Sequence, residues 1–326
     1  MRVLYAIALI VGVISINTTA YANKLDLSHK KLQAIPAELY EESALEELWL
    51  DDNQIMQIPE EIRYLSKLKK FSIYKNQLDS LDVLCHMIQL EKINASVNNL
   101  SSLPEQIGNL KNLQVLDLNY NQISELPNSV GNLLDLRFIL LASNRFNSLP
   151  HPFHNLTSLI YLNISFNSFS ILPEWIGDLS NLIELRLQNN QLITLPESLG
   201  RLTKLKEIYA MNNRITSLPS SLGECESLQR LILENNQLET LPNEITNLRN
   251  LSELDLRTNH LKSLPDNIGN LKALRRLDLR DNQLTSLPEG ILLLENLEKL
   301  DLRLNKNLEI PSWLNEIENR GCIVYY

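Results

Sequence analysis

Asparagine recurs through this chain at a nearly fixed interval. Ten of the eleven gaps between these residues are 23 positions long, and the gap from Asn76 to Asn98 is 22. The twelve positions are Asn53, Asn76, Asn98, Asn121, Asn144, Asn167, Asn190, Asn213, Asn236, Asn259, Asn282 and Asn305. Each has an apolar residue three, five and eight positions before it, and eleven of the twelve have a proline six positions after it. Such a period is typical of a stacked array of repeats and not of a domain with a single core.

One repeat combines two apolar periods. In residues 113–133, LQVLDLNYNQISELPNSVGNL, the leucines Leu116 and Leu118 alternate with a polar residue, which predicts a short strand. After the proline, apolar residues recur every three positions from Val130, which predicts a short helix or 3₁₀ turn on the opposite side.

The recurring asparagine has a structural explanation. Where the chain leaves a strand toward the core, backbone groups are buried without a partner in their own repeat. An amide side chain carries donors and an acceptor and can pair with the backbone of its own loop and of the next one. Leaving such a group unpaired costs about 1–3 kcal/mol. We therefore predict that the twelve asparagines form a structural ladder and do not bind a ligand.

The chain resembles the leucine-rich repeat family in its 23-residue class, with the consensus LPxxIGxLxxLxxLxLxxNxL. Residues 264–288, LPDNIGNLKALRRLDLRDNQLTSLP, fit nearly every diagnostic position, and the match runs from Lys24 to the C-terminus. The resemblance implies an α/β solenoid shaped like a curved horseshoe. It would hold about 13 repeats, with parallel strands on its concave face and short helical or 3₁₀ segments on its convex face. A single domain is expected over residues 23–326.

The two ends depart from the repeat. At the first strand, Lys30 replaces the asparagine. Residues 309–326 are predicted to form a C-terminal cap, in which Trp313, Leu314 and Ile317 cover the last layer of the core. Gly321 would end the capping helix before a closing strand. Terminal repeats need such changes because their cores are otherwise open to water.

Residues 1–22 have the composition of a cleavable signal peptide. Arg2 precedes an apolar run, VLYAIALIVGVISI, and Ala20-Tyr21-Ala22 provides a small-residue cleavage site. The alternative is a membrane anchor, but roughly 14 apolar residues are too few to span a bilayer comfortably. We predict cleavage after Ala22, a secreted or periplasmic product, and no stable membrane insertion after cleavage.

Composition argues against several classes of function. The formal net charge is −9 and no Lys- or Arg-rich run occurs, which argues against nucleic-acid binding. The histidines are scattered, and no nucleophile motif, phosphate loop or metal-spaced cysteine set is present. We therefore expect no enzymatic activity, no cofactor and no metal. Cys85, Cys225 and Cys322 are predicted to be reduced residues of the core.

The repeat between Asn76 and Asn98 is irregular, because it is one residue short and has Asp82 in place of its proline. It could be a hinge or a docking site. We favour a tolerated deletion that tightens the outer loop and changes the local curvature.

Any binding specificity is expected from the strand residues that alternate with the inward leucines. Several of these are aromatic or aliphatic where a solvated surface has no need of them, and exposed apolar patches and aromatic side chains often mark interaction sites. The predicted protein-binding residues are Trp49, Tyr74, Val115, Phe138, Leu140, Tyr161, Arg186, Tyr209, Met211 and Ile232. The alternative is a modest surface patch without a partner.

A charged ladder is expected nearer the C-terminus. The carboxylates are Asp255, Asp278 and Asp301, and an arginine follows each two residues later, at Arg257, Arg280 and Arg303. A cation site is one interpretation. Surface salt bridges contributing about 0–1 kcal/mol each are the favoured one.

These observations favour an exported, non-enzymatic module that binds a protein of unknown identity through the concave face. The resemblance implies roles in adhesion, host or receptor interaction, or scaffolding, and the chain is more similar to secreted bacterial leucine-rich repeat proteins than to animal receptors. One alternative is a structural, self-associating envelope protein. Another is an intracellular-type signalling adaptor, if the N-terminal run is not a signal peptide.

Overall fold

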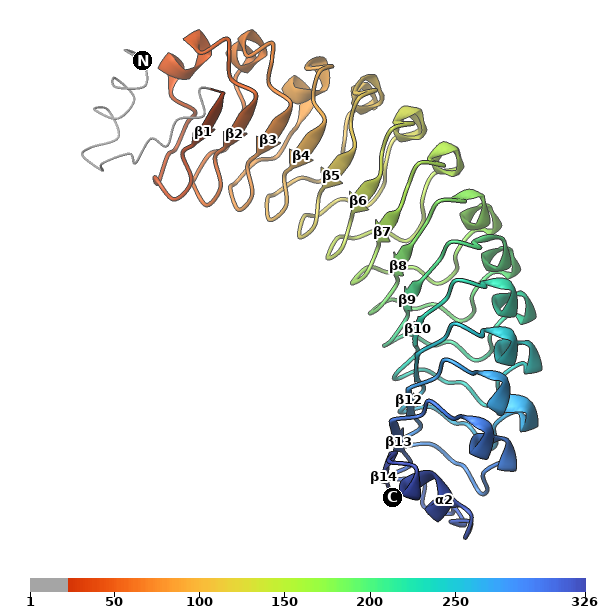
Figure 1. Ribbon diagram of the computed structural model, residues 1–326. Helices are drawn as coiled ribbons and strands as arrows, with labels where there is room; N and C mark the ends of the chain where they lie inside the picture. The colour runs from red at the N-terminus through yellow and green to blue at the C-terminus, as the bar shows by residue number, and fades with distance from the viewer. Residues whose placement is uncertain (1–22) are drawn as a thin grey trace. The chain divides into compact units, whose positions relative to one another are not determined.

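The structure is a computed structural model that describes residues 23–326, so the predicted signal peptide lies outside the described residues. The chain forms two compact units that divide between Leu159 and Ile160. In each unit, short parallel strands stack side by side and 3₁₀ turns line the opposite side (Figure 1). The expectation of one domain over 23–326 stays a prediction.

The described part of the first unit, residues 23–159, contains six strands, each three residues long. Consecutive strands pair in parallel and in register, so that Leu48 lies opposite Phe71. The strands are β1 (Lys24–Asp26), β2 (Glu47–Trp49), β3 (Lys70–Ser72), β4 (Lys92–Asn94), β5 (Val115–Asp117) and β6 (Phe138–Leu140). Its 3₁₀ turns are η1 (Ala37–Glu41), η2 (Glu60–Tyr64), η3 (Asp82–His86), η4 (Glu105–Asn109), η5 (Asn128–Asn132) and η6 (His151–Asn155).

The second unit repeats this arrangement and ends in a cap. Its strands are β7 (Tyr161–Asn163), β8 (Glu184–Arg186), β9 (Glu207–Tyr209), β10 (Arg230–Ile232), β11 (Glu253–Asp255), β12 (Arg276–Asp278), β13 (Lys299–Asp301) and β14 (Ile323–Tyr325). Its turns are η7 (Glu174–Asp178), η8 (Glu197–Arg201), η9 (Ser220–Glu224), η10 (Asn243–Asn247), η11 (Asp266–Asn270) and η12 (Glu289–Leu293), followed by helix α2 (Leu314–Asn319). Leu314 and Ile317 of α2 are each 1 % exposed, and Trp313 is half-buried.

The core is a stack of aliphatic layers. In the repeat around β5, the side chains of Leu113, Leu116 and Leu118 are fully buried. Burying each such side chain contributes about 1.5–3 kcal/mol, so the apolar positions of the repeat stabilise the stack directly. Cys85, Cys225 and Cys322 are free and buried in these layers, as predicted. Burial raises the pKa of the Cys85 thiol to about 12, which keeps it protonated.

The periodic asparagines join neighbouring repeats. The Nδ2 of Asn98 donates to the carbonyl of Ala95 in its own repeat (3.1 Å) and to that of Ile73 in the preceding repeat (3.0 Å). Its Oδ1 accepts the N–H of Leu78 in the preceding repeat, at 3.0 Å. We had expected the asparagine to bond to the following repeat. Its second partner is instead the preceding repeat. One side chain thus satisfies backbone groups that neither strand pairing nor the 3₁₀ turn can reach.

The residue before each ladder asparagine has a left-handed backbone. The φ angles there range from 52° at Asp52 to 65° at Leu304. Side chains with a Cβ are disfavoured in this region, and Asn tolerates it best. Some repeats have Asn at this position, among them Asn212, but Val97 places a β-branched side chain there at φ 55°.

The irregular repeat keeps its register. Its strands pair as the others do, with Phe71 opposite Ile93. The turn η3 begins at Asp82 itself, whereas the other turns begin one residue after their proline. The N–H of Asp82 donates to the hydroxyl of Ser80, at 3.0 Å, a bond that proline cannot form. Loss of the proline and loss of one residue are thus a coupled change in the outer turn.

The helical elements of the described residues are short. Within 23–326, none is long and apolar enough to cross a membrane.

Replacing a ladder asparagine should destabilise the protein strongly. Asn236→Ala leaves the N–H of Ile215 without its partner. It also removes one of the two amide bonds that each of the carbonyls of Ala210 and Leu233 accepts, leaving those from Asn213 and Asn259. We expect the free energy of unfolding to fall by on the order of 2–3 kcal/mol, measured by urea denaturation. The exposed neighbour Gln237→Ala is the matched control and should change it by less than about 0.5 kcal/mol. Equal effects of the two substitutions would show that the hydrogen bonds of the Asn236 amide do not stabilise the protein.

Replacing Val97, which is strained in its left-handed backbone conformation, should stabilise the protein. Val97→Asn replaces a β-branched residue at φ 55° with the residue type that other repeats use at the same place. The free energy of unfolding should rise by about 1 kcal/mol. The reciprocal change, Asn189→Val, should lower it. A Val97→Asn protein that melts at or below the wild-type temperature would contradict the assigned strain.

Candidate functional site

The strand face is defined here as the side of each sheet that bears the residues six, four and two positions before each ladder asparagine. These alternate along the strand with fully buried leucines. In the first unit, the strand face of β5 and β6 carries Val115, Phe138 and Leu140, all half-buried. Val115 lies opposite Phe138 in the parallel ladder. The structure therefore brings these three predicted residues into one apolar patch.

The two aromatic residues nearer the N-terminus lie apart from this patch. Trp49 ends β2 opposite Ser72 of β3, and Tyr74 follows β3 by two residues. Tyr74 is 38 % exposed, but Trp49 is half-buried and less open than expected. The N–H of Tyr74 donates to the Oδ1 of Asp51, at 3.0 Å. Strands β3 and β4 separate Trp49 from Val115.

In the second unit an arginine lies between two tyrosines on successive strands. The guanidinium carbon of Arg186 is 5.8 Å from the ring centre of Tyr161 on β7 and 4.9 Å from that of Tyr209 on β9. Its Nε donates to Glu184 at 2.6 Å. The hydroxyl of Tyr209 donates to Glu207, also at 2.6 Å. Cation–π contacts and ion pairs thus hold three large side chains in fixed positions.

Two further predicted residues continue this row. Ile232 lies opposite Tyr209 in the ladder, and Met211 follows β9 by two residues. Met211 is half-buried, but only 7 % of Ile232 is exposed. Ile232 is therefore less open than we expected.

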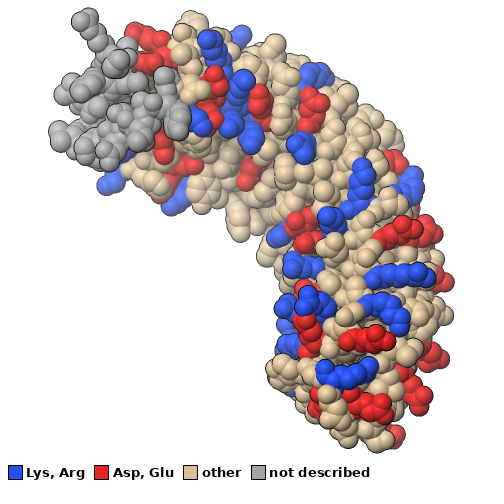
Figure 2. Space-filling model, viewed as in Figure 1, with Lys and Arg blue, Asp and Glu red and all other residues tan. Residues whose placement is uncertain are grey.

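Sequence reasoning missed a charged row beside these residues. Residues six positions before the ladder asparagines alternate in sign across β9 to β12, and Arg230 lies between Glu207 (3.6 Å) and Glu253 (3.4 Å). Arg276 lies 3.9 Å from Glu253 on the far side. The signal was available as opposite charges 23 residues apart. Figure 2 shows Lys or Arg and Asp or Glu side chains interspersed over the second unit.

The predicted Asp/Arg ladder of ion pairs is present, and its carboxylates are more buried than its arginines. Arg303 donates through Nη2 and Nε to the two oxygens of Asp301, at 2.6 and 2.9 Å, and Asp301 is fully buried. Arg280 binds Asp278 in the same way and also lies 3.4 Å from Asp301. Because the carboxylate of Asp301 is buried, the contribution of about 0–1 kcal/mol for fully exposed pairs does not apply to it.

The pKa values within this ladder diverge. Burial alone would raise the pKa of Asp301, but hydrogen bonds from Arg303 and the charge of Arg280 hold it below its ordinary value. Burial raises the pKa of Asp255 to about 6, and the carboxylates of Asp278 and Glu234 act in the same direction. Asp255 gains less from its arginine because Arg257 also binds Glu234, at 2.7 Å.

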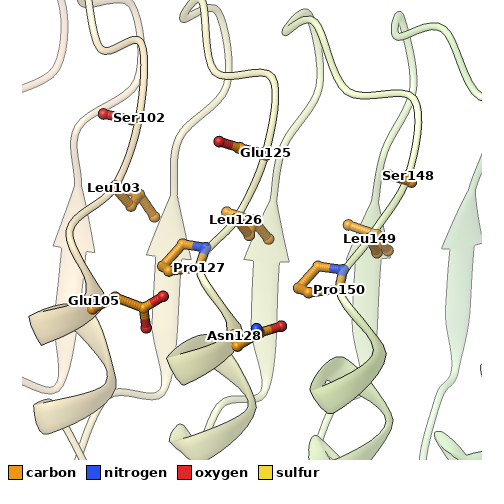
Figure 3. Close-up of a pocket in the computed structure, with 10 residues that line it drawn as sticks. All are labelled: Ser102, Leu103, Glu105, Glu125, Leu126, Pro127, Asn128, Ser148, Leu149 and Pro150. Carbon is orange, nitrogen blue, oxygen red and sulfur yellow. The ribbon is translucent and has the colours of Figure 1, made fainter.

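The first unit also contains a hollow of about 440 Å³ beside its turns (Figure 3). Equivalent residues of three successive repeats line it, including Leu126, Pro127 and Pro150. Glu105 projects beside it and accepts the N–H of Ser129, at 3.3 Å. Its apolar walls are the leucines and prolines that recur in each repeat, so we assign the hollow to the framework.

Among residues 23–326, no three His, Cys, Asp or Glu side chains are placed to bind one ion. His151 and His154 contact each other edge to face, with 4.6 Å between ring centres.

Family models agree with the repeat seen in the coordinates. A model described as a leucine-rich repeat region matches residues 72–166 and 154–257. Other leucine-rich repeat models match residues 44–65 and 249–306. The chain belongs to the leucine-rich repeat family.

Curated leucine-rich repeat proteins match only short stretches of the chain. The mouse leucine-rich repeat and calponin homology domain-containing protein 1 is 41 % identical over 88 residues, which are 27 % of this chain and 12 % of that protein. The rat leucine-rich repeat-containing protein 7 is 47 % identical over 58 residues, 18 % of this chain and 4 % of its own length. The match thus covers a small part of these relatives.

Solved leucine-rich repeat structures match far more of this chain. A leucine-rich repeat protein of Leptospira interrogans is 28 % identical with a TM-score of 0.63, covering 93 % of this chain and 95 % of that one. The Arabidopsis receptor kinase HAESA, solved with a peptide hormone and a co-receptor, is 29 % identical with a TM-score of 0.70, covering 88 % and 57 %. A Listeria monocytogenes internalin, 24 % identical with a TM-score of 0.68 and 88 % coverage of both chains, shares the fold.

Asp255 should make this leucine-rich repeat protein less stable as the pH rises. Its pKa is about 6 when folded and 3.8 ordinarily, so between these values the unfolded chain loses its proton first. The free energy of unfolding should fall from pH 4 to pH 7 by on the order of 2–3 kcal/mol relative to Asp255→Asn. Urea denaturation of both proteins at several pH values measures this. A difference that does not vary with pH would contradict the raised pKa.

Proposed function

We propose that this chain is an exported, non-enzymatic module that binds a protein partner through its strand face. The observation that carries the proposal is the apolar and aromatic character of non-framework positions on that face. Val115, Phe138 and Leu140 gather on one unit, and Tyr161 and Tyr209 flank Arg186 on the other. The repeat itself requires apolar residues only at the inward positions.

The chemistry of these side chains suits a binding surface. Tyrosine and arginine are the residue types most enriched among those that dominate binding energy, and they are most effective when held rigidly. Ring contacts and the ion pair with Glu184 hold Arg186 in this way. Binding therefore requires little further ordering of these side chains.

The comparisons support the same kind of function. The receptor kinase HAESA, with 29 % identity, was solved with a peptide bound. The Leptospira interrogans protein matches nearly the whole length of this chain. The family models that match residues 44–65, 72–257 and 249–306 are all repeat models, which supports a role without catalysis. Export is proposed from residues 1–22, and sequencing the N-terminus of the mature protein tests it.

The strand face should carry the affinity. The mature protein is cross-linked to its neighbours on the surface of the producing cell, and the partner recovered is titrated by surface plasmon resonance. Phe138→Ala and Tyr209→Ala should each weaken binding about 10-fold or more, because each removes an anchor. Leu134→Ala and Ile171→Ala are the matched controls, since both side chains are exposed apolar residues off the strand face. They should leave affinity unchanged.

Two outcomes would contradict the proposal. Equal affinity in Phe138→Ala and Tyr209→Ala would exclude the strand face as the binding surface. Recovery of only further copies of this chain, with an oligomer in sedimentation equilibrium, would instead favour the self-associating envelope protein.

A further inference from the structure

Asp117 is a half-buried carboxylate without a counter-ion. It ends β5, and its Oδ1 accepts the N–H of Asn119, at 3.0 Å. Among the described residues no Lys, Arg or His lies within salt-bridge distance of it. Burial raises its pKa, opposed only by that N–H and by no nearby cation. An ionised carboxylate at this position is therefore left partly desolvated and uncompensated.

The same position in the second unit shows what a complete site contains. Asp278 and Asp301 occupy it on β12 and β13, and an arginine two residues later binds each with two N–H groups. In the repeat of Asp117 the residue two positions later is Asn119. Its Oδ1 accepts the N–H of Ala142, at 2.7 Å, which directs that oxygen toward β6. The guanidinium found in the other repeats is missing here.

The surroundings of Asp117 suit the stem of a long cationic side chain. Leu140 lies opposite Asp117 in the strand pairing. Val115 and Phe138 form the pair two residues earlier on the same two strands. All three are half-buried apolar residues. On the other side, Asn94 of β4 lies opposite Asp117, and Lys92, opposite Val115, is exposed and forms no ion pair with Asp117. Among the described residues, the immediate neighbours of Asp117 on β4 and β6 are therefore an amide and an aliphatic side chain and not a cation.

We propose that Asp117 receives an arginine side chain from the protein that docks on the strand face. The guanidinium binds the carboxylate in the geometry that Arg280 and Arg303 show, and the stem of the side chain packs on Phe138 and Leu140. Arginine fits better than lysine because its planar fork binds both oxygens and stacks on an aromatic ring. This inference rests on the proposed function and names the chemistry of its partner.

A peptide selection tests the inference directly. Random dodecapeptides displayed on phage are selected on the mature protein, and binders sensitive to Phe138→Ala are kept. These should share an arginine, and its replacement by citrulline should weaken binding about 10-fold or more. Asp117→Asn should abolish the difference between the arginine and citrulline peptides. Asn119→Arg supplies the guanidinium from the chain itself and should weaken binding of the arginine peptide by a similar factor.

The outcomes separate this inference from the proposed function. Binders that depend on Phe138 but carry no common arginine, or that ignore Asp117→Asn, would overturn the arginine site and leave the strand face intact. Failure to select any peptide dependent on Phe138 would count against both.

Stability provides a test that needs no ligand. Asp117→Asn should raise the melting temperature, because it removes a lone, half-buried charge while its Oδ1 can still accept the N–H of Asn119. Asp301→Asn, in the paired site, should lower it. A melting temperature that falls in Asp117→Asn as it does in Asp301→Asn would show that Asp117 already has a partner within the fold, and would overturn the inference.

Discussion

The structure depends on one polar contact repeated along each unit, the asparagine amide that bonds to its own repeat and to the one before it. A three-residue strand and a five-residue turn have too few hydrogen bonds to be stable alone. Leu50 and Asn53 show how the ladder compensates, since the Nδ2 of Asn53 binds the carbonyls of Leu50 and Leu27 in adjacent repeats. Each repeat is thus completed by its neighbour, as the one-dimensional stability of solenoids requires. Hydrophobic burial supplies most of the free energy, and the amides determine the register.

Because the inward positions and the ladder are committed to the framework, the chemistry of the strand face depends on the outward positions of each strand. There the two units differ in chemistry. The first presents an apolar patch around Phe138 beside an unpaired carboxylate, and the second presents Arg186 between two tyrosines, followed by ion pairs. The charged rows neutralise themselves within the chain, since Arg280 binds Asp278 and Arg303 binds the buried Asp301. The groups proposed to engage a partner are the apolar side chains, Arg186 with its two tyrosines, and Asp117.

The sequence predicted the strands, the outer turns, the buried cysteines and the positions of the cap closely. Its predictions for side chains were less complete. Ile232 was expected on the open face, but it is less open than expected. The Asp/Arg ladder was identified correctly as a set of ion pairs, yet its burial was not foreseen. Asp117 was not singled out, although Asn119, two residues later, stands where Arg280 and Arg303 stand in the paired repeats.

By itself the sequence determined the repeat, its register and the set of residues excluded from the framework. The sequence determined these properties because the apolar spacing and the asparagine period are local patterns that recur in every repeat. Only the tertiary structure decided how deeply each strand-face residue is buried and which charges pair. Those properties depend on side chains 23 residues apart, whose sizes and rotamers act together across strands. The sequence shows aspartates at 117 and 301, followed two residues later by Asn119 and Arg303. Only the tertiary structure shows that Asp301 is fully buried and paired, whereas Asp117 is half-buried without an ion pair.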